Sequence, residues 1–166
     1  DAFTEAYPDA ECAGVRLAYA VEDEPLDTAG AIRFAAAEAG VDERFLVLNG
    51  DVLTDLDVGA LLAAHEAHAA GGGWGTIHLH PVDDPSRYGV VPLDEDDRVV
   101  EFVEKPARDR APSNWINAGT YVLEPEFLQR IPPRLKVSIE RETFPRLLEQ
   151  VPGAVFGYQN DSYWLD

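Results

Sequence analysis

The stretch Phe45-Leu46-Val47-Leu48-Asn49-Gly50-Asp51 decides the fold class of this chain. A short continuous apolar run that ends in turn residues is typical of a strand covered on both faces, as in a parallel sheet. The polar residues that follow stand at the carboxyl end of the strand. Because open α/β sheets bind ligands beyond the carboxyl ends of their strands, a site is expected first in this segment.

Helical patterns flank this strand on both sides. We expect Thr28 to cap a helix over residues 29–39 that ends at Gly40, and Asp57 to cap a helix over residues 58–70. Further upstream, the run VRLAYAV at residues 15–21 predicts a buried strand. This order of strand, helix, strand, helix predicts an α/β sheet whose parallel part comes first.

The pattern changes after residue 74. Alternation over residues 75–80 and β-rich runs at 88–91, 99–103 and 116–123 predict further strands. A helix is expected over residues 138–149, weakened at Pro145, with short strands at 155–158 and 162–165. The whole chain is therefore predicted to be one α/β domain, residues 1–166, with a mixed sheet in its second half.

The composition excludes several classes of partner. The chain has 31 Asp and Glu against 13 Lys and Arg, a net charge of −18, which argues against nucleic acid and anionic membranes as partners. Its single Cys excludes an internal disulfide and a zinc site built from cysteines. No apolar run is long enough to span a membrane, and no signal peptide is recognisable, so a cytoplasmic location is expected.

Two further features of the composition lead to expectations. An acidic, Ala-rich, Lys-poor composition favours a salt-adapted protein, because salt screens the self-repulsion of such a charge, although a GC-rich genome is an alternative. The chain has no Met, which predicts that it starts downstream of its start codon.

A few polar positions at predicted strand ends could take part in chemistry. Asp51 could hold a divalent cation or simply stabilise a turn. Glu104 and Lys105, within FVEKP at residues 102–106, could bind sugar hydroxyls and a phosphate, or form a surface ion pair. Gly89 would let a ligand approach the backbone, and Asn117 offers a donor and an acceptor; strand geometry alone is the alternative for both.

The four histidines do not predict a metal site. His65 and His68 share a helical face, and His78 and His80 share a strand face. No Cys accompanies them and no HExxH-like pattern is present. We therefore expect them to lie on solvated or partner-covered faces.

The order of the motifs along the chain is more specific than any one of them. EDEPLDTAG at 22–30, NGD at 49–51, PSRYGVV at 85–91, FVEKP at 102–106, INAGTY at 116–121 and SIERETFP at 138–145 occur in this order, and YWLD ends the chain at 163–166. Together they resemble the sugar-1-phosphate nucleotidyltransferases, and most of all the mannose-1-phosphate guanylyltransferases. The resemblance implies a Rossmann-like nucleotide-diphospho-sugar transferase fold with a mixed central sheet. It also implies the conversion of GTP and mannose 1-phosphate to GDP-mannose and diphosphate.

The resemblance also implies roles for individual residues. Asp51 and Asp166 match the aspartates that bind the catalytic Mg²⁺, and with Lys105 they form the implied catalytic set. The positions that match the sugar-phosphate site are Gly89, Glu104, Lys105 and Asn117, with Lys105 facing the phosphate and Glu104 the hydroxyls. The positions that match the nucleotide site are Thr28, Ala29, Gly30 and Asp51. The expected partners are a nucleoside triphosphate, a sugar 1-phosphate and further copies of the chain in a homo-oligomer.

Two departures from the family pattern lead to alternatives. The glycine-rich loop that binds the triphosphate is not in the sequence, so we expect the first strand and this loop to lie upstream of Asp1, and residues 1–166 alone to be nearly inactive. Asp27 stands where the family usually has Gly. The alternatives are a glucose-1-phosphate thymidylyl- or uridylyltransferase, and a non-catalytic subunit that senses sugar nucleotides, which Asp27 favours.

Overall fold

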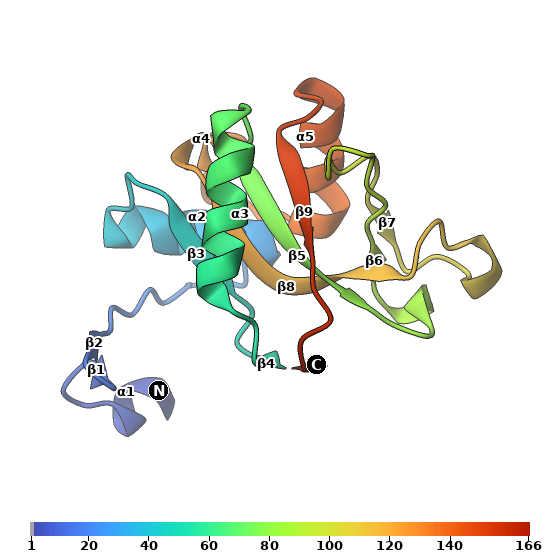
Figure 1. Cartoon of the computed structure of the whole chain (residues 1–166). Coiled ribbons are helices and arrows are strands. Elements are labelled where there is room, and N and C mark those ends of the chain that lie inside the picture. Colours follow the sequence, from blue (N-terminus) through green and yellow to red (C-terminus); the bar gives the residue numbers. More distant parts are fainter. Residues whose placement is uncertain (1) are drawn as a thin grey trace.

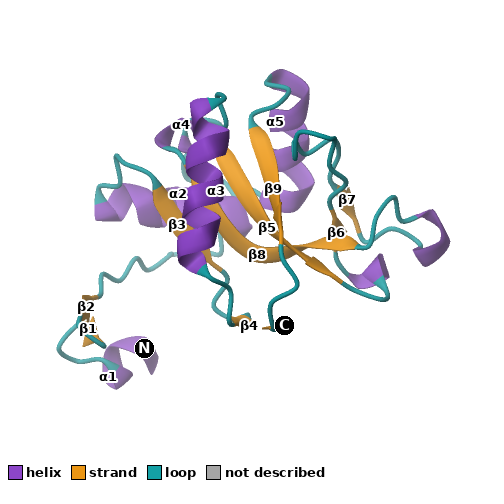
Figure 2. Cartoon of the chain, viewed as in Figure 1, coloured by secondary structure: helices purple, strands orange, loops and turns teal. Residues whose placement is uncertain are grey.

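A mixed sheet organises the computed structural model, which describes residues 2–166 (Figures 1 and 2). The strand order is β7 (Val103–Glu104), β6 (Gly89–Val90), β8 (Trp115–Leu123), β5 (Gly75–Pro81) and β9 (Val155–Gln159), and β3 (Phe45–Leu48) also pairs with β8. Only β5 and β9 run parallel; the other pairs in this sheet are antiparallel. The predicted α/β class and mixed sheet are confirmed.

The strand β8 is the centre of the sheet because it is long, rich in β-formers and buried along most of its length. β5 pairs with one edge of it, while β3 and β6 share the other edge. The expectation that β3 lies in a parallel part of the sheet is wrong. β3 pairs antiparallel with β8, through a register that sets Phe45 opposite Leu123 and Leu48 opposite Thr120.

Helices cover both faces of the sheet. On one face, α2 (Asp27–Ala39), α4 (Pro125–Leu128) and α5 (Phe144–Gln150) pack against Ile77, Leu79 and Tyr121 in the larger apolar core. On the other face, α3 (Val58–Ala70) packs against Val122 in a smaller cluster. Because side chains alternate along a strand, neighbouring residues of β8 reach both clusters. Within residues 2–166, no helix is long and apolar enough to cross a bilayer.

The helix ends follow the sequence pattern in most cases. The Asp57 carboxylate accepts a hydrogen bond from the Ala60 N–H at 3.0 Å and caps α3, and Gly40 ends α2 with φ 65°. The expected cap at Thr28 is wrong, since α2 already begins at Asp27 and has no side-chain cap. The predicted helix over 138–149 is divided into a π-turn, η3 (Ile139–Thr143), and α5, in which Pro145 lies in the first turn.

The N-terminal arm stands away from the sheet (Figure 1). It consists of α1 (Ala2–Ala6) and a hairpin of β1 (Glu11–Cys12) with β2 (Val15–Arg16). The predicted buried strand over 15–21 is therefore wrong in extent: only its first two residues pair, and Val15 and Val21 are exposed. An apolar, β-forming run makes a longer strand only where another strand lies alongside it.

Several other predicted strands are shorter in the structure. The runs at 88–91 and 99–103 contribute only β6 and β7, which pair Gly89 with Glu104. The last predicted strand is reduced to β10 (Trp164–Leu165), which pairs with β4 (Leu53–Thr54) outside the main sheet. The short helical turns η1 (Pro85–Arg87) and η2 (Arg108–Arg110) fill the connections around β6 and β7.

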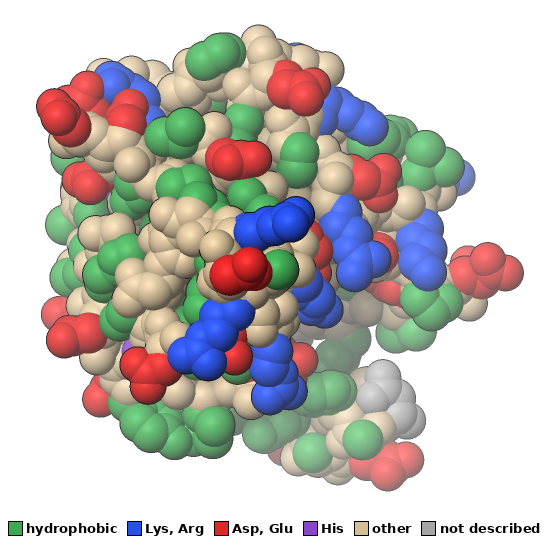
Figure 3. Space-filling view, turned by 90° about the vertical axis from the view of Figure 1, so that its right-hand side faces the viewer, with side chains coloured by type: hydrophobic (Ala, Val, Ile, Leu, Met, Phe, Trp, Pro, Cys, Tyr) green, Lys and Arg blue, Asp and Glu red, His purple; other side chains and the backbone are tan. Residues whose placement is uncertain are grey.

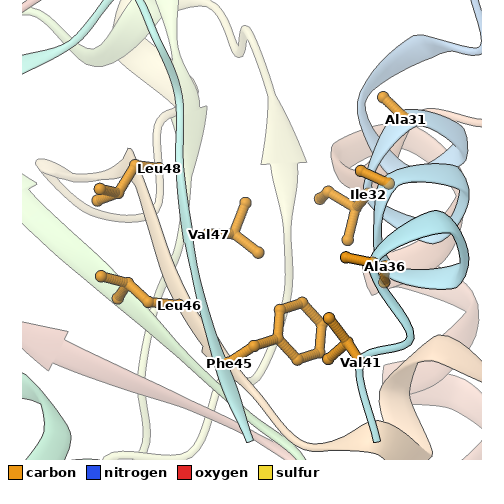
Figure 4. Close-up of a pocket in the computed structure, with 10 residues that line it drawn as sticks. Ala31, Ile32, Ala36, Val41, Phe45, Leu46, Val47 and Leu48 are labelled. Carbon is orange, nitrogen blue, oxygen red and sulfur yellow. The ribbon is translucent and has the colours of Figure 1, made fainter. Parts of the chain in front are cut away.

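A groove of about 450 Å³ lies between α2 and β3 (Figure 4). Among the described residues, β3 pairs only with β8, so its other edge is open toward this groove. Ile32 and Val41 on one side and Phe45 and Val47 on the other point into it (Figure 4). Every lining side chain is apolar, so this groove offers no side chain to bind a charged ligand.

Candidate functional site

A polar pocket of about 380 Å³ forms where α2, β6, β7, β8 and η3 converge. Its lining residues are Asp27, Asn49, Arg87, Tyr88, Gly89, Glu104, Lys105, Asn117, Ser138, Glu140, Arg141 and Asp166. The predicted sugar-phosphate residues Gly89, Glu104, Lys105 and Asn117 thus lie together, with Asp166. Asp51, Thr28, Ala29 and Gly30 are not among the lining residues.

The pair of strands β6 and β7 sets one wall of the pocket. Gly89 lies opposite Glu104, and a Cβ at Gly89 would come within 2.6 Å of the Phe102 ring and 3.3 Å of the Glu104 carboxylate. Only glycine therefore fits at this position without displacing the neighbours. The absence of a side chain at Gly89 leaves the Glu104 carboxylate, whose side chain is 25% exposed, facing the pocket.

Lys105 follows β7 in a left-handed backbone conformation, with φ 48°. Its N–H donates to the Tyr88 carbonyl at 3.0 Å, which fixes the backbone in this conformation. The ammonium lies 3.6 Å from Glu104 and its side chain is 57% exposed, so it is free to approach a ligand. Left-handed conformations are uncommon for residues other than glycine, so this backbone bond is needed to hold Lys105 in place.

Asn117 is held in one orientation on β8. Its Nδ2 donates to the Tyr121 hydroxyl at 2.8 Å, and its Oδ1 accepts from the Gly119 N–H at 3.1 Å. Burial raises the pKa of Tyr121, so its hydroxyl stays protonated. The amide therefore presents fixed donor and acceptor positions to the pocket.

Gly119 brings the segment after β3 against this wall. It has φ 75°, and a Cβ there would lie 2.7 Å from the Asn49 side-chain nitrogen. The Asn49 N–H donates to the Gly119 carbonyl at 2.9 Å. This close approach places the NGD segment, which the sequence singles out, beside Asn117.

Thr28, Ala29 and Gly30 join α2 to the segment before η3. The Thr28 hydroxyl donates to Glu140 at 3.0 Å and accepts from the Ile139 N–H at 2.8 Å. The N–H groups of Ala29 and Gly30 donate to the Val137 carbonyl at 3.0 and 3.2 Å. These hydrogen bonds hold α2 against η3, which carries pocket residues. The contact of these residues with a nucleotide stays a prediction.

Asp27, next to them, does line the pocket. It has φ 62°, and its carboxylate accepts from the Thr28 N–H at 2.8 Å. A left-handed position explains why glycine is the usual residue there, and Asp is one of the few other residues that tolerate it. The hydrogen bond from the next residue's N–H holds the carboxylate at the start of α2, on the wall of the pocket.

Asp166 reaches the pocket through β10. The antiparallel register of β10 with β4 pairs Leu165 with Leu53. Continuing this register sets Asp166 opposite residue 52, which is the neighbour of Asp51 in the sequence. The Trp164 indole donates to the Ala118 carbonyl at 3.0 Å and fixes β10 beside β8. Carboxylates such as those of Asp51 and Asp166 are hard oxygen donors of the kind that Mg²⁺ prefers. Within residues 2–166, no three His, Cys, Asp or Glu side chains gather as a metal site.

Six pocket residues were not predicted as site residues from the sequence: Asn49, Arg87, Tyr88, Ser138, Glu140 and Arg141. All of them lie in motifs that carry the family resemblance, so these motifs could have identified them as candidate site residues. In Figure 3, Lys and Arg side chains gather on the side of the molecule where β6 and β7 lie in Figure 1. In a chain with a net charge of −18, these cations are the groups on this side of the molecule that could bind an anion.

The histidines lie elsewhere and are more buried than expected. His65 on α3 and His78 on β5 are both fully buried, so the expectation of a solvated face is wrong for them. His65 bonds to Thr76 through Nδ1 at 2.9 Å and to Glu124 through Nε2 at 3.1 Å. Burial lowers the pKa of His65 and lowers that of His78 to about 4.

Comparison with known proteins gives consistent results. The family model described as nucleotidyl transferase matches residues 1–166. A mannose-1-phosphate guanylyltransferase of Mycobacterium tuberculosis is 40% identical over 164 residues, which are 99% of this chain and 44% of that protein. A mannose-1-phosphate guanyltransferase of Candida albicans is 41% identical over 92% of this chain and 41% of its own length. The chain thus spans about two fifths of these relatives.

Solved structures share the fold. HddC from Yersinia pseudotuberculosis, complexed with GMP-PN, aligns with a TM-score of 0.76 and 27% identity over 100% of this chain and 68% of its own. A structure described as a putative glucose-1-phosphate thymidylyltransferase from Bacillus anthracis aligns with a TM-score of 0.75 at 22% identity, over 92% of this chain and 60% of its own.

Proposed function

The chain belongs to the nucleotidyl transferase family. From that premise we propose that it is part of a sugar-1-phosphate nucleotidyltransferase of the mannose-1-phosphate guanylyltransferase type. In the proposed reaction, a phosphate oxygen of mannose 1-phosphate attacks the α-phosphorus of GTP. The bond from that phosphorus to the diphosphate breaks, and GDP-mannose and diphosphate are formed. The relatives at about 40% identity support this choice of base and sugar.

One observation supports the proposal above all others: the pocket in which Glu104, Lys105 and Asn117 face the same space. An ammonium and carboxylate at the rim of one pocket, with an oriented amide, suit a ligand that carries both a phosphate and hydroxyls. A pocket for an apolar ligand would lack these groups.

The roles of the residues follow from their chemistry. The Lys105 ammonium binds the sugar phosphate as a point charge, and Glu104 accepts hydrogen bonds from sugar hydroxyls. The Asn117 amide fixes the ring orientation, since its own partners leave it no freedom to turn. Transfer between two anions depends mainly on such positioning and on neutralising crowded negative charge.

We also propose that Asp51 and Asp166 would hold Mg²⁺. When bound, the ion offsets phosphate charge during transfer. The pairing of β10 with β4 supports this proposal, because it sets Asp166 opposite residue 52. Asp51 is exposed, so its carboxylate is accessible to an ion from solvent.

A titration with nucleotide sugars tests the proposed specificity. Calorimetry with GDP-mannose, UDP-glucose and dTDP-glucose is expected to give the tightest binding for GDP-mannose, by about tenfold, which is ~1.4 kcal/mol. Tighter binding of UDP-glucose or dTDP-glucose would instead favour a glucose-1-phosphate uridylyl- or thymidylyltransferase.

Asp27 favours one second candidate, a subunit that senses nucleotide sugars without catalysis. Its carboxylate lines the pocket at a position where the related motif has glycine. The affinity for GDP-mannose is measured for the unaltered chain and for Asp27→Gly. An unchanged affinity in the variant would remove this support. An assay of diphosphate release from GTP and mannose 1-phosphate by the full-length protein separates the enzyme, which releases diphosphate, from the sensor, which does not.

A further inference from the structure

Another cation, Arg141, lines the same pocket as Lys105. The Glu104 Oε1 atom lies 3.6 Å from the Lys105 ammonium and 3.8 Å from the Arg141 guanidinium. Both distances exceed that of a hydrogen bond. Glu104 is therefore a counter-ion that the two cations share, and it forms a hydrogen bond with neither of them.

The backbone of Arg141 is fixed, although its side chain is free. The Arg141 N–H donates to the Ser138 hydroxyl oxygen at 3.2 Å, and η3 is anchored by the contact of Glu140 with Thr28. The Arg141 side chain is 66% exposed. It can therefore turn toward a ligand while its origin stays in place on a different element from that of Lys105.

The balance of charge in the pocket calls for more than one cation on a bound phosphate. The lining carboxylates are those of Asp27, Glu104, Glu140 and Asp166, and the lining cations are those of Arg87, Lys105 and Arg141. A phosphate monoester brings further negative charge into this surplus of acids. One ammonium would leave much of that charge unopposed, whereas a guanidinium can bind two phosphate oxygens at once.

We propose that Arg141 is a second phosphate ligand, which binds the phosphate of the sugar 1-phosphate together with Lys105 but from a different element, η3. Its exposed contact with Glu104 contributes little, so exchanging that contact for phosphate costs little. Glu104 is then released toward the sugar hydroxyls. This inference rests on the proposed function, because it concerns the same pocket.

Calorimetric titration with mannose 1-phosphate tests the inference on the 166-residue chain. Arg141→Gln is expected to raise the dissociation constant about tenfold, and Arg141→Lys to restore part of the affinity. The matched control is Arg146→Gln, which removes the same charge from α5 at an exposed position outside the pocket and is expected to change nothing. The fold-change of ten corresponds to ~1.4 kcal/mol.

The outcomes separate the two claims. If the unaltered chain does not bind mannose 1-phosphate, the proposed function fails. If it binds, and Arg141→Gln binds equally well, Arg141 is not a phosphate ligand. Competition by inorganic phosphate adds a readout that a merely structural role would not change: it should weaken with Arg141→Gln. Equal competition in both proteins would also overturn the inference, and a thermal melt of each variant verifies that it is folded.

Discussion

Lys105 and Asp27 both line the pocket in left-handed backbone conformations, although neither is glycine. The Tyr88 carbonyl fixes the first, and the Asp27 carboxylate fixes the second by bonding to the next N–H. Such positions cost the fold free energy, of order 1–2 kcal/mol for most residues, and persist because neighbouring contacts impose them. At the scale of the residue, the pocket is therefore built in advance of its ligand.

The close contact at Gly119 gives a prediction about stability. Gly119→Ala is expected to reduce the free energy of unfolding by about 2–3 kcal/mol, because it adds a clash with Asn49 to the strain of a positive φ. Gly72→Ala is the matched control. Gly72 also has a positive φ but has nothing within 4 Å, so only the strain, about 1 kcal/mol, is expected there. Equal effects in urea denaturation would show that the contact with Asn49 is unimportant.

At the scale of the element, the pocket depends on how α2 is joined to η3. Thr28 carries this junction through its bonds to Glu140 and Ile139. Thr28→Val keeps the shape of the side chain but leaves the Ile139 N–H without its acceptor, so a loss of about 1–3 kcal/mol is expected. Thr28→Ser keeps the hydroxyl and serves as the control. A Val variant as stable as the Ser variant would contradict this role for the hydroxyl.

Local patterns predicted the elements whose signals are local. The strand at 45–48 and the cap at Asp57 are confirmed because an apolar run and a capping carboxylate act within a few residues. The antiparallel pairing of β3 could not be predicted, because its partner lies at residues 120–123 and nothing near β3 specifies it. The run at 15–21 has the composition of a strand, yet composition alone supplies no hydrogen-bond partner.

The pocket was predicted in part for a related physical reason. Glu104, Lys105 and Asn117 lie on or beside strands, where alternation tells which face a side chain takes. Arg141 lies in a π-turn, where the Thr143 N–H bonds to the Ser138 carbonyl five residues back. This wider turn changes the direction of its side chains relative to an ordinary helix, so helical periodicity does not reveal which ones reach the pocket.

At the scale of the whole molecule, the stability of the protein is expected to depend on salt through its acidic composition and on pH through its histidines. The expectation of salt adaptation stays a prediction that rests on the charge of −18. The histidines lead to a more specific prediction about pH. Burial lowers the pKa of all four of them, His65, His68, His78 and His80. The unfolded chain binds protons on these rings at a higher pH than the folded chain does.

The buried ring of His78 therefore predicts acid sensitivity. Its pKa is about 4 in the folded protein and 6.5 as the ordinary value, so its contribution to stability is full above pH 6.5 and falls as the pH drops toward 4. Between pH 7 and pH 4.5 this single group is expected to cost about 2–3 kcal/mol. Urea denaturation of His78→Leu beside the unaltered chain, at both pH values, measures it. Identical pH dependence in the two proteins would contradict the prediction.

The central claim is that Lys105 binds the phosphate of a sugar 1-phosphate, and the chain offers a well-matched control because its other lysine, Lys136, is exposed and outside the pocket. The decisive measurement is the calorimetric affinity for mannose 1-phosphate of the unaltered chain, Lys105→Met and Lys136→Met. We predict that Lys105→Met loses at least about tenfold in affinity, ~1.4 kcal/mol, while Lys136→Met binds as the unaltered chain does. Equal affinity in all three proteins would contradict the account.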